Sequence, residues 1–526
     1  MNGMNMRGSR LEHVSKNFKW AAANSVVITI FPFLIRTLLI HNIGVEYGGV
    51  SSLFSSVFQI LNLADFGIEN AILSYLYYPA ATGDNGSVCY LIRLLKKIYR
   101  IIGVLILTVG CVLIPFIPYL VKGKEYPEGL NLYLVYVIYL INACCPYLTL
   151  GYRITVLRVN QRVDLISVAS VVSATLMYSL QIISLTVCRS YYLYSILLLL
   201  GTIGNVVLNS ILAERFCPLD LEKPEVSCGL EENKAFHREL RQKFLSVGLA
   251  KLRNLSRSSF DSIVISSFLG LSILAKYNNY CLILMVPVTL ISIIHGALVP
   301  SLGNSLALRS ERENYAVVKT YAFFRHGIVV VFLSCLLNLY QPFVVLWIGV
   351  DYLLPFSIVV LLCIYFYLYC LVDINEVLKE STGVWEQERI LAIVEATANL
   401  CLNIVLVRKM GVAGVILATI VTILFINLPV EYYCIFRMYF KANGRDFFLS
   451  ECKHTAITIG ITVLTYLICS EIPSGNFSGM FLRICAAVLV PACLFLVCYR
   501  NNAQLRLFFG MLSSFLKKWK KKQKKV

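Results

Sequence analysis

The chain has 526 residues, of which 58% are hydrophobic and only 14% are charged, and its mean hydropathy is +0.73. This composition excludes an ordinary soluble protein and is typical of a protein that crosses a membrane many times. The net charge of +18 does not indicate a nucleic-acid partner, because the basic residues lie between apolar runs and at the carboxyl end rather than in a soluble basic domain.

Apolar runs long enough to cross the hydrocarbon core of a bilayer recur along the whole chain. We therefore predict an all-α polytopic membrane protein with about fourteen transmembrane helices. The predicted helices are 18–40, 49–75, 97–121, 132–150, 165–187, 192–212, 245–268, 273–299, 318–339, 356–378, 390–407, 411–435, 456–470 and 481–499.

The distribution of Lys and Arg predicts the orientation of these helices. With the amino terminus in the cytoplasm, most basic residues between the spans fall on the cytoplasmic side, as the positive-inside rule expects. The last ten residues, KKWKKKQKKV, are strongly basic, so an even number of helices that returns the tail to the cytoplasm is favoured. We expect no cleaved signal peptide, and we expect the tail to be either an interfacial helix or a solvated segment.

The longest polar stretch, 214–243, follows the sixth predicted helix and is expected to be a cytoplasmic linker. It divides the chain into an amino-terminal lobe at 1–213 and a carboxyl-terminal lobe of six helices at 244–450. Two further helices and the basic tail occupy 451–526.

The predicted span 245–268 is unusual because Lys251, Arg253, Arg257 and Asp261 lie in its middle. An ionised side chain at the centre of a membrane costs roughly 2.5–3.5 kcal/mol, so this face is not expected to meet lipid. At helical spacing these residues share one stripe, which predicts a wet, net-positive cavity on that side. Three alternatives stay open: an Arg257–Asp261 ion pair that is purely structural, a Lys251 that snorkels, and an amphipathic helix that does not span. Polar residues that continue the stripe are Asn254, Ser258 and Ser262.

Four of the other ionisable residues within predicted spans are candidates for a functional role. Arg36 is near the outer end of the first span and either reaches the cavity or snorkels to the interface. Asp65 and Glu69 are four residues apart in the second span, so they either carry a proton or sodium ion or pair with an arginine. Glu395, in the eleventh span, is either a coupling residue or the partner of a buried cation.

The sequence contains none of the motifs that would indicate an enzyme. A P-loop, HExxH, GxSxG and a loop DxD site are all absent, and the 18 cysteines have no CxxC or metal-ligand spacing, so we expect no cofactor and no metal. The longest outside loop, 341–355, is too short for a separate domain, which argues against a glycan polymerase or ligase. A transporter is therefore the favoured class.

Several stretches resemble the bacterial polysaccharide biosynthesis and export family, the flippases of Wzx type. The amino-terminal likeness consists of Arg36, a Gly-x-x-Tyr-Gly turn at 44–48 and an Asp-x-Gly motif at 65–67. Later stretches similar to the family are FDSIVISSFLGLSILAKYNNY, LWIGVDYL and EATANLCLNIVLVRKMGVAGVILATIVTIL.

The resemblance implies two pseudo-symmetric six-helix lobes around a central cavity, plus two carboxyl-terminal helices. It also implies a flippase for polyprenyl-diphosphate-linked oligosaccharide repeat units in the bacterial inner membrane, serving O-antigen, capsule or exopolysaccharide assembly. Membrane lipids, a polysaccharide polymerase and glycosyltransferases are the implied partners. A multidrug/cation antiporter of the same fold and a non-transporting scaffold of a glycan-assembly complex stay open as alternatives.

On this reading the cations form a clamp for the diphosphate head group, since arginine stays ionised and donates paired hydrogen bonds to phosphate oxygens. The candidate head-group residues are Arg253, Arg257, Arg36, Lys251, Asn254 and Ser258. Asp261 is expected to hold Arg257 in one of two states. The candidate ion-coupling residues are Asp65, Glu69, Asp261 and Glu395.

Overall fold

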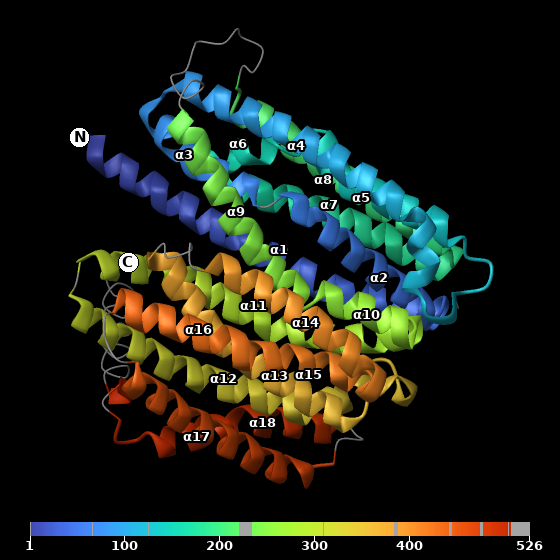
Figure 1. Cartoon of the computed structure of the whole chain (residues 1–526), viewed down its shortest axis with the longest axis vertical. Helices are drawn as coiled ribbons and strands as arrows, with labels where there is room; N and C mark the ends of the chain where they lie inside the picture. Colours follow the sequence, from blue (N-terminus) through green and yellow to red (C-terminus); the bar gives the residue numbers. More distant parts are fainter. Residues whose placement is uncertain are drawn as a thin grey trace. The chain divides into compact units, whose positions relative to one another are not determined.

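The computed structural model describes residues 2–65, 67–124, 126–219, 234–308, 310–382, 388–440, 444–473, 477–502 and 504–506. Within these ranges the chain is helical almost throughout and has no strand, which confirms the predicted all-α class (Figure 1). The predicted basic tail at 507–526 and most of the predicted linker, at 220–233, lie outside the described residues.

The chain divides into two units, Met1–Asn279 with Glu388–Ala418, and Tyr280–Gln387 with Thr419–Val526. The helices of the first unit are α1 (Asn2–Asn42), α2 (Val45–Leu61), η1 (Asn62–Asp65), α3 (Ile68–Thr82), α4 (Asn85–Leu113), η2 (Ile114–Leu120), η3 (Lys122–Lys124), α5 (Leu132–Leu148), α6 (Arg153–Val159), α7 (Val163–Ile183), η4 (Ser184–Cys188), α8 (Tyr191–Phe216), α9 (Lys234–Ser256), α10 (Ser259–Leu269) and α14 (Glu388–Met410).

The helices of the second unit are α12 (Glu311–Trp347), η5 (Val350–Tyr352), α13 (Phe356–Thr382), η6 (Ile423–Asn427), α16 (Leu428–Tyr433), η7 (Cys434–Tyr439), α17 (Arg445–Ser470) and α18 (Phe477–Cys498). Two helices contribute residues to both units, α11 (Leu271–Leu308) and α15 (Val412–Thr422). The predicted division into lobes at 214–243 stays a prediction, but α9, α10 and α14 group with the amino-terminal helices.

Among the described residues, eleven helices are long and apolar enough to cross a membrane, or twelve if the bent pair α5 and α6 forms one span. The chain is thus a multi-pass membrane protein. Two predicted spans, 49–75 and 245–268, are missing from this set because the structure breaks each of them into shorter helices. The count of fourteen stays a prediction.

The predicted continuous helix at 245–268 is wrong in one respect: α9 ends at Ser256 and α10 begins at Ser259. The backbone leaves helical geometry at Ser258, where φ is −133° and ψ is −58°. The break follows from the local sequence Ser-Arg-Ser-Ser, since serine hydroxyls compete for backbone partners. The Ser256 hydroxyl donates to the carbonyl oxygen of Arg253 at 2.8 Å.

The predicted helix at 49–75 is also broken. After α2 the chain forms the short 3-10 turn η1, and Gly67 then adopts a left-handed conformation with φ of 67° before α3 begins. Glycine adopts this conformation at little steric cost, which explains the glycine of the Asp-x-Gly motif. The motif therefore marks a break and not the interior of a helix.

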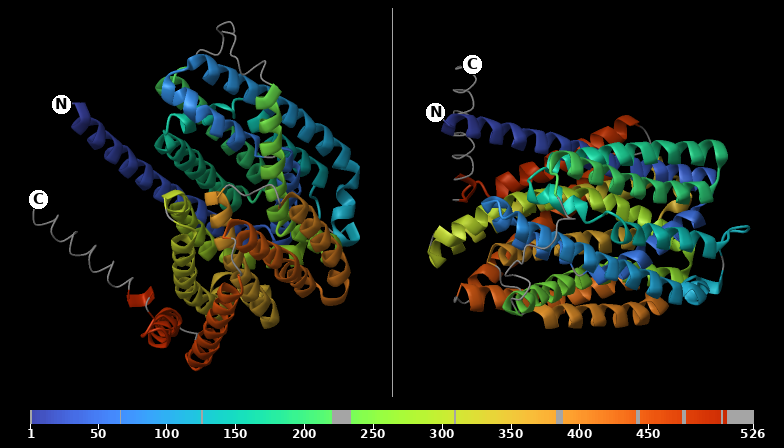
Figure 2. Two further views of the ribbon diagram at one scale, coloured as in Figure 1. Left: turned by 60° about the vertical axis from the view of Figure 1, so that its left-hand side comes forward. Right: turned by 90° about the horizontal axis from the view of Figure 1, so that it is seen from above.

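Within the first unit, α1 packs along α7 and α7 along α8, while α4 packs on α5 (Figures 1 and 2). The broken helices also meet each other, because α2 packs on α10 and α3 on α9. Gly49 lets α2 approach α11 closely, since a Cβ atom there would collide with the carbonyl group of Leu271.

Within the second unit, α12 packs on α13, α17 and α18. The aromatic side chains of Phe323, Phe495 and Tyr499 are buried together where these helices meet. The capping box at Ser310 and Glu313 begins α12, with each side chain bonded to the other residue's backbone. The described carboxyl-terminal helices are thus packed parts of the bundle.

Candidate functional site

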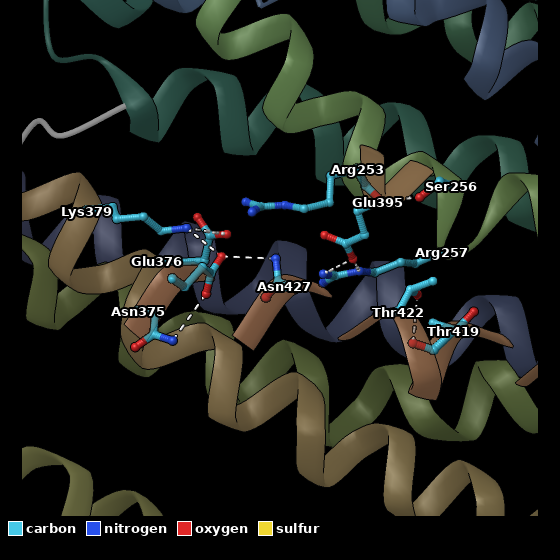
Figure 3. Close-up of polar contacts among 11 residues, drawn as sticks. Arg253, Ser256, Arg257, Asn375, Glu376, Lys379, Glu395, Thr419, Thr422 and Asn427 are labelled. Atoms are coloured by element: carbon cyan, nitrogen blue, oxygen red, sulfur yellow. Dashed lines mark hydrogen bonds and ion pairs between the residues drawn. The ribbon is translucent and has the colours of Figure 1, made fainter. Parts of the chain in front are cut away.

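The break between α9 and α10 carries a buried ion pair. Arg257 lies in the turn itself, and its Nε donates to Oε1 of Glu395 at 2.8 Å while its Nη2 donates to the same oxygen (Figure 3). The side chains of Arg257 and Glu395 are 6% and 0% exposed. A charge-assisted pair enclosed in this way fixes the guanidinium group to α14.

Arg253 lies one turn before Arg257 on α9 and is only 1% exposed, so a second guanidinium group is buried on this part of the helix (Figure 3). Ser258 is exposed in the turn that separates α9 from α10. The side chain of Asn254 lies outside the part of the chain that the structure describes. Of the predicted clamp residues, Arg253 and Arg257 are therefore the two that the break buries together.

Helix α14 presents a row of polar residues at a spacing of four. Glu395, Asn399 and Asn403 are all fully buried. Asn403 Nδ2 donates to Oδ1 of Asp261 at 2.6 Å and to Oδ1 of Asn399 at 3.2 Å. The sequence analysis identified Asp261 and Glu395 but missed the two asparagines, although their spacing within an apolar helix was a usable signal.

The structure differs from the predicted wet, net-positive face of the segment 245–268. Arg253, Arg257 and Asp261 are all buried, and Glu395 supplies a second carboxylate, which pairs with Arg257. This part of the protein is therefore close to charge balance. The local sequence could not show this, because Glu395 lies 138 residues away from Arg257 along the chain.

Arg36 belongs to α1, and its side chain contacts α2 and the start of α11. Its Nη1 donates to the carbonyl oxygen of Gly48 at 2.8 Å, and its Nη2 donates to that of Ala275 at 2.9 Å. Its Nε donates to Oδ1 of Asn279 at 2.6 Å. The side chain thus holds three segments of the first unit together, while its two predicted settings, the cavity and the interface, stay predictions.

Lys251 joins the two broken helices. Its Nζ lies 2.9 Å from Oδ2 of Asp65, which belongs to the break after α2. A second contact joins the same regions, since Ser259 Oγ donates to Oε1 of Gln59 at 2.9 Å. The break between α9 and α10 therefore lies beside the break between α2 and α3.

Glu69 has several partners on neighbouring helices. Its Oε1 lies 2.9 Å from Nη1 of Arg158 and accepts from Oγ1 of Thr155 at 2.9 Å. Its Oε2 accepts from the Tyr99 hydroxyl at 3.4 Å. Asp65 and Glu69 both line a cavity of about 450 Å³ inside the first unit, among α3, α5, α6, α7 and α8.

The second unit has buried ion pairs of its own that the sequence analysis did not identify. Glu431 is fully buried and accepts from Lys379 Nζ at 2.7 Å, and Asn375 and Asn427 each donate to it at 3.1 Å (Figure 3). Their signal was again polar residues four apart, at 375 and 379 and at 427 and 431.

A further buried pair joins α12 to α17. Arg325 pairs with Glu451, and both side chains are nearly inaccessible. His326 lies 3.4 Å from the same carboxylate. Glu451 is thus neutralised inside the second unit by a cation on a neighbouring helix.

Comparison with known proteins places this geometry in context. The sequence is similar to the family described as polysaccharide biosynthesis protein over residues 14–306. None of the curated proteins matches the sequence.

Solved structures share the fold at low sequence identity. The lipid II flippase MurJ in an inward closed conformation is 14% identical, with a TM-score of 0.63, and the match covers 92% of this chain and 99% of that one. An inward-facing multidrug resistance transporter of the MATE family, in the MOP superfamily, is also 14% identical, with a TM-score of 0.60 over 79% of this chain and 97% of that one. A MOP-superfamily transporter from Pyrococcus furiosus is 16% identical, with a TM-score of 0.54 over 80% and 93%.

Proposed function

Because the chain belongs to the polysaccharide biosynthesis protein family, we propose that it is a flippase for polyprenyl-diphosphate-linked oligosaccharide repeat units. It moves them from the cytoplasmic to the outer leaflet of the bacterial inner membrane, for O-antigen, capsule or exopolysaccharide assembly. The likeness in fold to a lipid II flippase supports this class of cargo. A polysaccharide polymerase and glycosyltransferases are the proposed partners, and both termini are proposed to be cytoplasmic.

The observation that carries the proposal is the pair of buried arginines beside the break between α9 and α10. A diphosphate that enters a low-dielectric interior needs positive charge and hydrogen-bond donors to replace water. Arg253 and Arg257 lie one turn apart and supply two guanidinium groups for this purpose. Discontinuous helices are typical of transporter binding sites, because their helix ends and unwound backbone groups bind the substrate and its ions.

Glu395 gives the clamp a means of release. In the absence of substrate it neutralises Arg257, so the guanidinium group is not left as an isolated buried charge. The diphosphate takes the place of Glu395 on binding, and Glu395 takes it back when the lipid leaves. This is the role that the sequence analysis assigned to Asp261, whose carboxylate accepts instead from Asn403. The transport cycle is alternating access.

Lys251, Asn254 and Ser258 remain secondary head-group candidates, and Arg36 becomes the least favoured, because backbone carbonyls already engage two of its nitrogens. Ion coupling through Asp65, Glu69, Asp261 or Glu395 stays a proposal. Asp65, Glu69 and Glu395 each pair with a cationic side chain, and Asp261 accepts from the amide of Asn403. Protonation of any of these carboxylates would release its partner.

The alternatives differ in charge and in outcome. An antiporter for organic cations needs an acidic, aromatic site, whereas α9 supplies arginines. A scaffold would transport nothing. The test is translocation of a fluorescent lipid-linked repeat unit in liposomes, read with a membrane-impermeant quencher. Acceleration over protein-free liposomes is expected. A rate equal to that of protein-free liposomes would refute the flippase, and drug resistance without any effect on glycan would favour the antiporter.

A further inference from the structure

The first unit contains a partly open cavity that the diphosphate clamp does not use. Its volume of about 450 Å³ is in the range of small-molecule sites. Its walls come from the α2–α3 break, from the α5–α6 pair, which is bent by 52°, and from α7 and α8. Gly151 permits this bend, because a Cβ atom there would collide with the carbonyl group of Pro146.

The charges on the cavity wall cancel. Asp65 is paired with Lys251, and Glu69 is paired with Arg158, each at 2.9 Å. Each carboxylate thus has a cation beside it, so the cavity has no excess charge with which to hold a free cation or a phosphate. The ligand that suits such a wall is polar and neutral.

The uncharged part of the wall is rich in amides and hydroxyls, namely Ser170, Ser173, Thr202, Asn205 and Asn209. Asn209 is only 3% exposed, and its Oδ1 has no hydrogen-bond partner among the described residues. The Oδ1 of Asp65 is likewise buried without a partner among them. Buried acceptors without partners are costly, so the cavity favours a ligand that donates several hydrogen bonds.

The rest of the wall is apolar and includes Met177, Leu198 and the ring of Tyr147. Tyr147 packs edge-on against Tyr99, which also lines the cavity, with ring centroids 5.2 Å apart. A sugar ring combines many hydroxyl donors with an apolar C–H face, and it therefore matches both parts of the wall. We propose that this cavity is a subsite for uncharged sugar residues of the transported glycan, a proposal that rests on the proposed function.

The test separates the glycan from the lipid head group. The first probe is the free oligosaccharide released by mild acid from lipid-linked repeat units of the strain that encodes the chain. The second is polyprenyl diphosphate without glycan. Binding of each to the full-length protein in nanodiscs is measured for the wild type, Ala174→Phe and Leu176→Phe. Ala174 lines the cavity, whereas Leu176, on the same helix, is 61% exposed and serves as the matched control.

Ala174→Phe is expected to weaken binding of the oligosaccharide by about tenfold or more, because the ring fills the cavity, and to leave polyprenyl diphosphate binding unchanged. Leu176→Phe should change neither. Asn209→Leu adds little volume and should weaken oligosaccharide binding by about fivefold to tenfold through the lost acceptor, which keeps the test valid if Ala174→Phe does not fold.

The proposal is overturned if the wild type does not bind the oligosaccharide, or if folded Ala174→Phe and Asn209→Leu bind it normally. It is also overturned if oligosaccharide binding depends on sodium ions and is unchanged in the cavity variants. Failure of the wild type to bind polyprenyl diphosphate would instead refute the proposed flippase function, and the oligosaccharide result would still be read separately.

Discussion

At the scale of single residues, Arg257 has two roles that a simple substitution would confuse. Arg257→Ala leaves Glu395 as a buried charge without this partner, which should cost about 3–5 kcal/mol of folding free energy. The double variant Arg257→Ala with Glu395→Gln removes both charges and should recover most of that stability. If Arg257 binds the diphosphate, the double variant should still fail to translocate the lipid-linked repeat unit in liposomes.

The second unit offers a matched control for that experiment. Arg325 and Glu451 form a buried pair of similar exposure outside the proposed clamp. Arg325→Ala with Glu451→Gln should likewise keep most of its stability, because both charges are removed together, and it should keep translocation per folded molecule. Normal translocation by the Arg257 and Glu395 double variant would show that the first pair is only structural.

Arg253 tests the geometry of the clamp. Arg253→Ala should lose export of the finished polysaccharide. Arg253→Lys should restore it only in part, because an ammonium group cannot donate two parallel hydrogen bonds to a phosphate. Surface polysaccharide, measured at equal protein level, is the readout, and wild-type export by the alanine variant would remove Arg253 from the clamp.

Asp65 and Glu69 test ion coupling. Their cation partners, Lys251 and Arg158, are 40% and 37% exposed, so an amide at either carboxylate leaves no enclosed charge behind. Asp65→Asn and Glu69→Gln should thus preserve the fold. If either residue carries the coupling ion, its amide variant should translocate at one rate with and without a proton or sodium gradient. Retained gradient dependence in both variants would assign the carboxylates a structural role.

At the scale of helices, the break between α2 and α3 depends on one backbone conformation. Gly67 has a φ of 67°, and Gly83, after α3, has a φ of 74° with no atom within 4 Å of the place that a Cβ atom would occupy. Alanine at either site should cost about 1–2 kcal/mol, because L-residues disfavour this region. Similar losses of thermal stability are therefore expected for Gly67→Ala and Gly83→Ala.

The two glycine variants should differ in function. Gly67 lies two residues after Asp65, which is paired with Lys251 of α9, whereas Gly83 lies at the far end of α3. If the two adjacent breaks move during transport, Gly67→Ala should slow translocation and Gly83→Ala should not. Equal rates for the two variants would mean that the break is a fixed feature of the fold.

The helices and the breaks also differ in how well the sequence predicts them. Hydropathy alone identified the long apolar helices, because the cost of placing polar groups in lipid leaves few alternatives. The break at Ser258 was missed, because a polar stripe at helical spacing is the same whether or not one turn is unwound. The Arg257 partner was missed for another reason: a contact between the α9–α10 turn and α14 is decided by packing and has no local signal.

At the scale of the whole molecule, the distribution of charge predicts which ends of the chain face the cytoplasm. The segment 222–234 and the tail after residue 506 lie between or beyond predicted spans, and the tail is strongly basic. Basic segments next to spans are retained on the cytoplasmic side, where anionic lipid also attracts them. A reporter that is active only in the periplasm should therefore be silent after Val526 and within 222–234.

The same reporter placed within the predicted outside loop 341–355 should be active, and it serves as the control for expression and export. Activity at both the tail and 222–234 would invert the whole topology. Activity at the tail alone would mean an odd number of spans, and the first segments to re-examine would be 49–75 and 245–268. Each of these is broken in the structure, so each can cross the membrane only if its two pieces together form one discontinuous span.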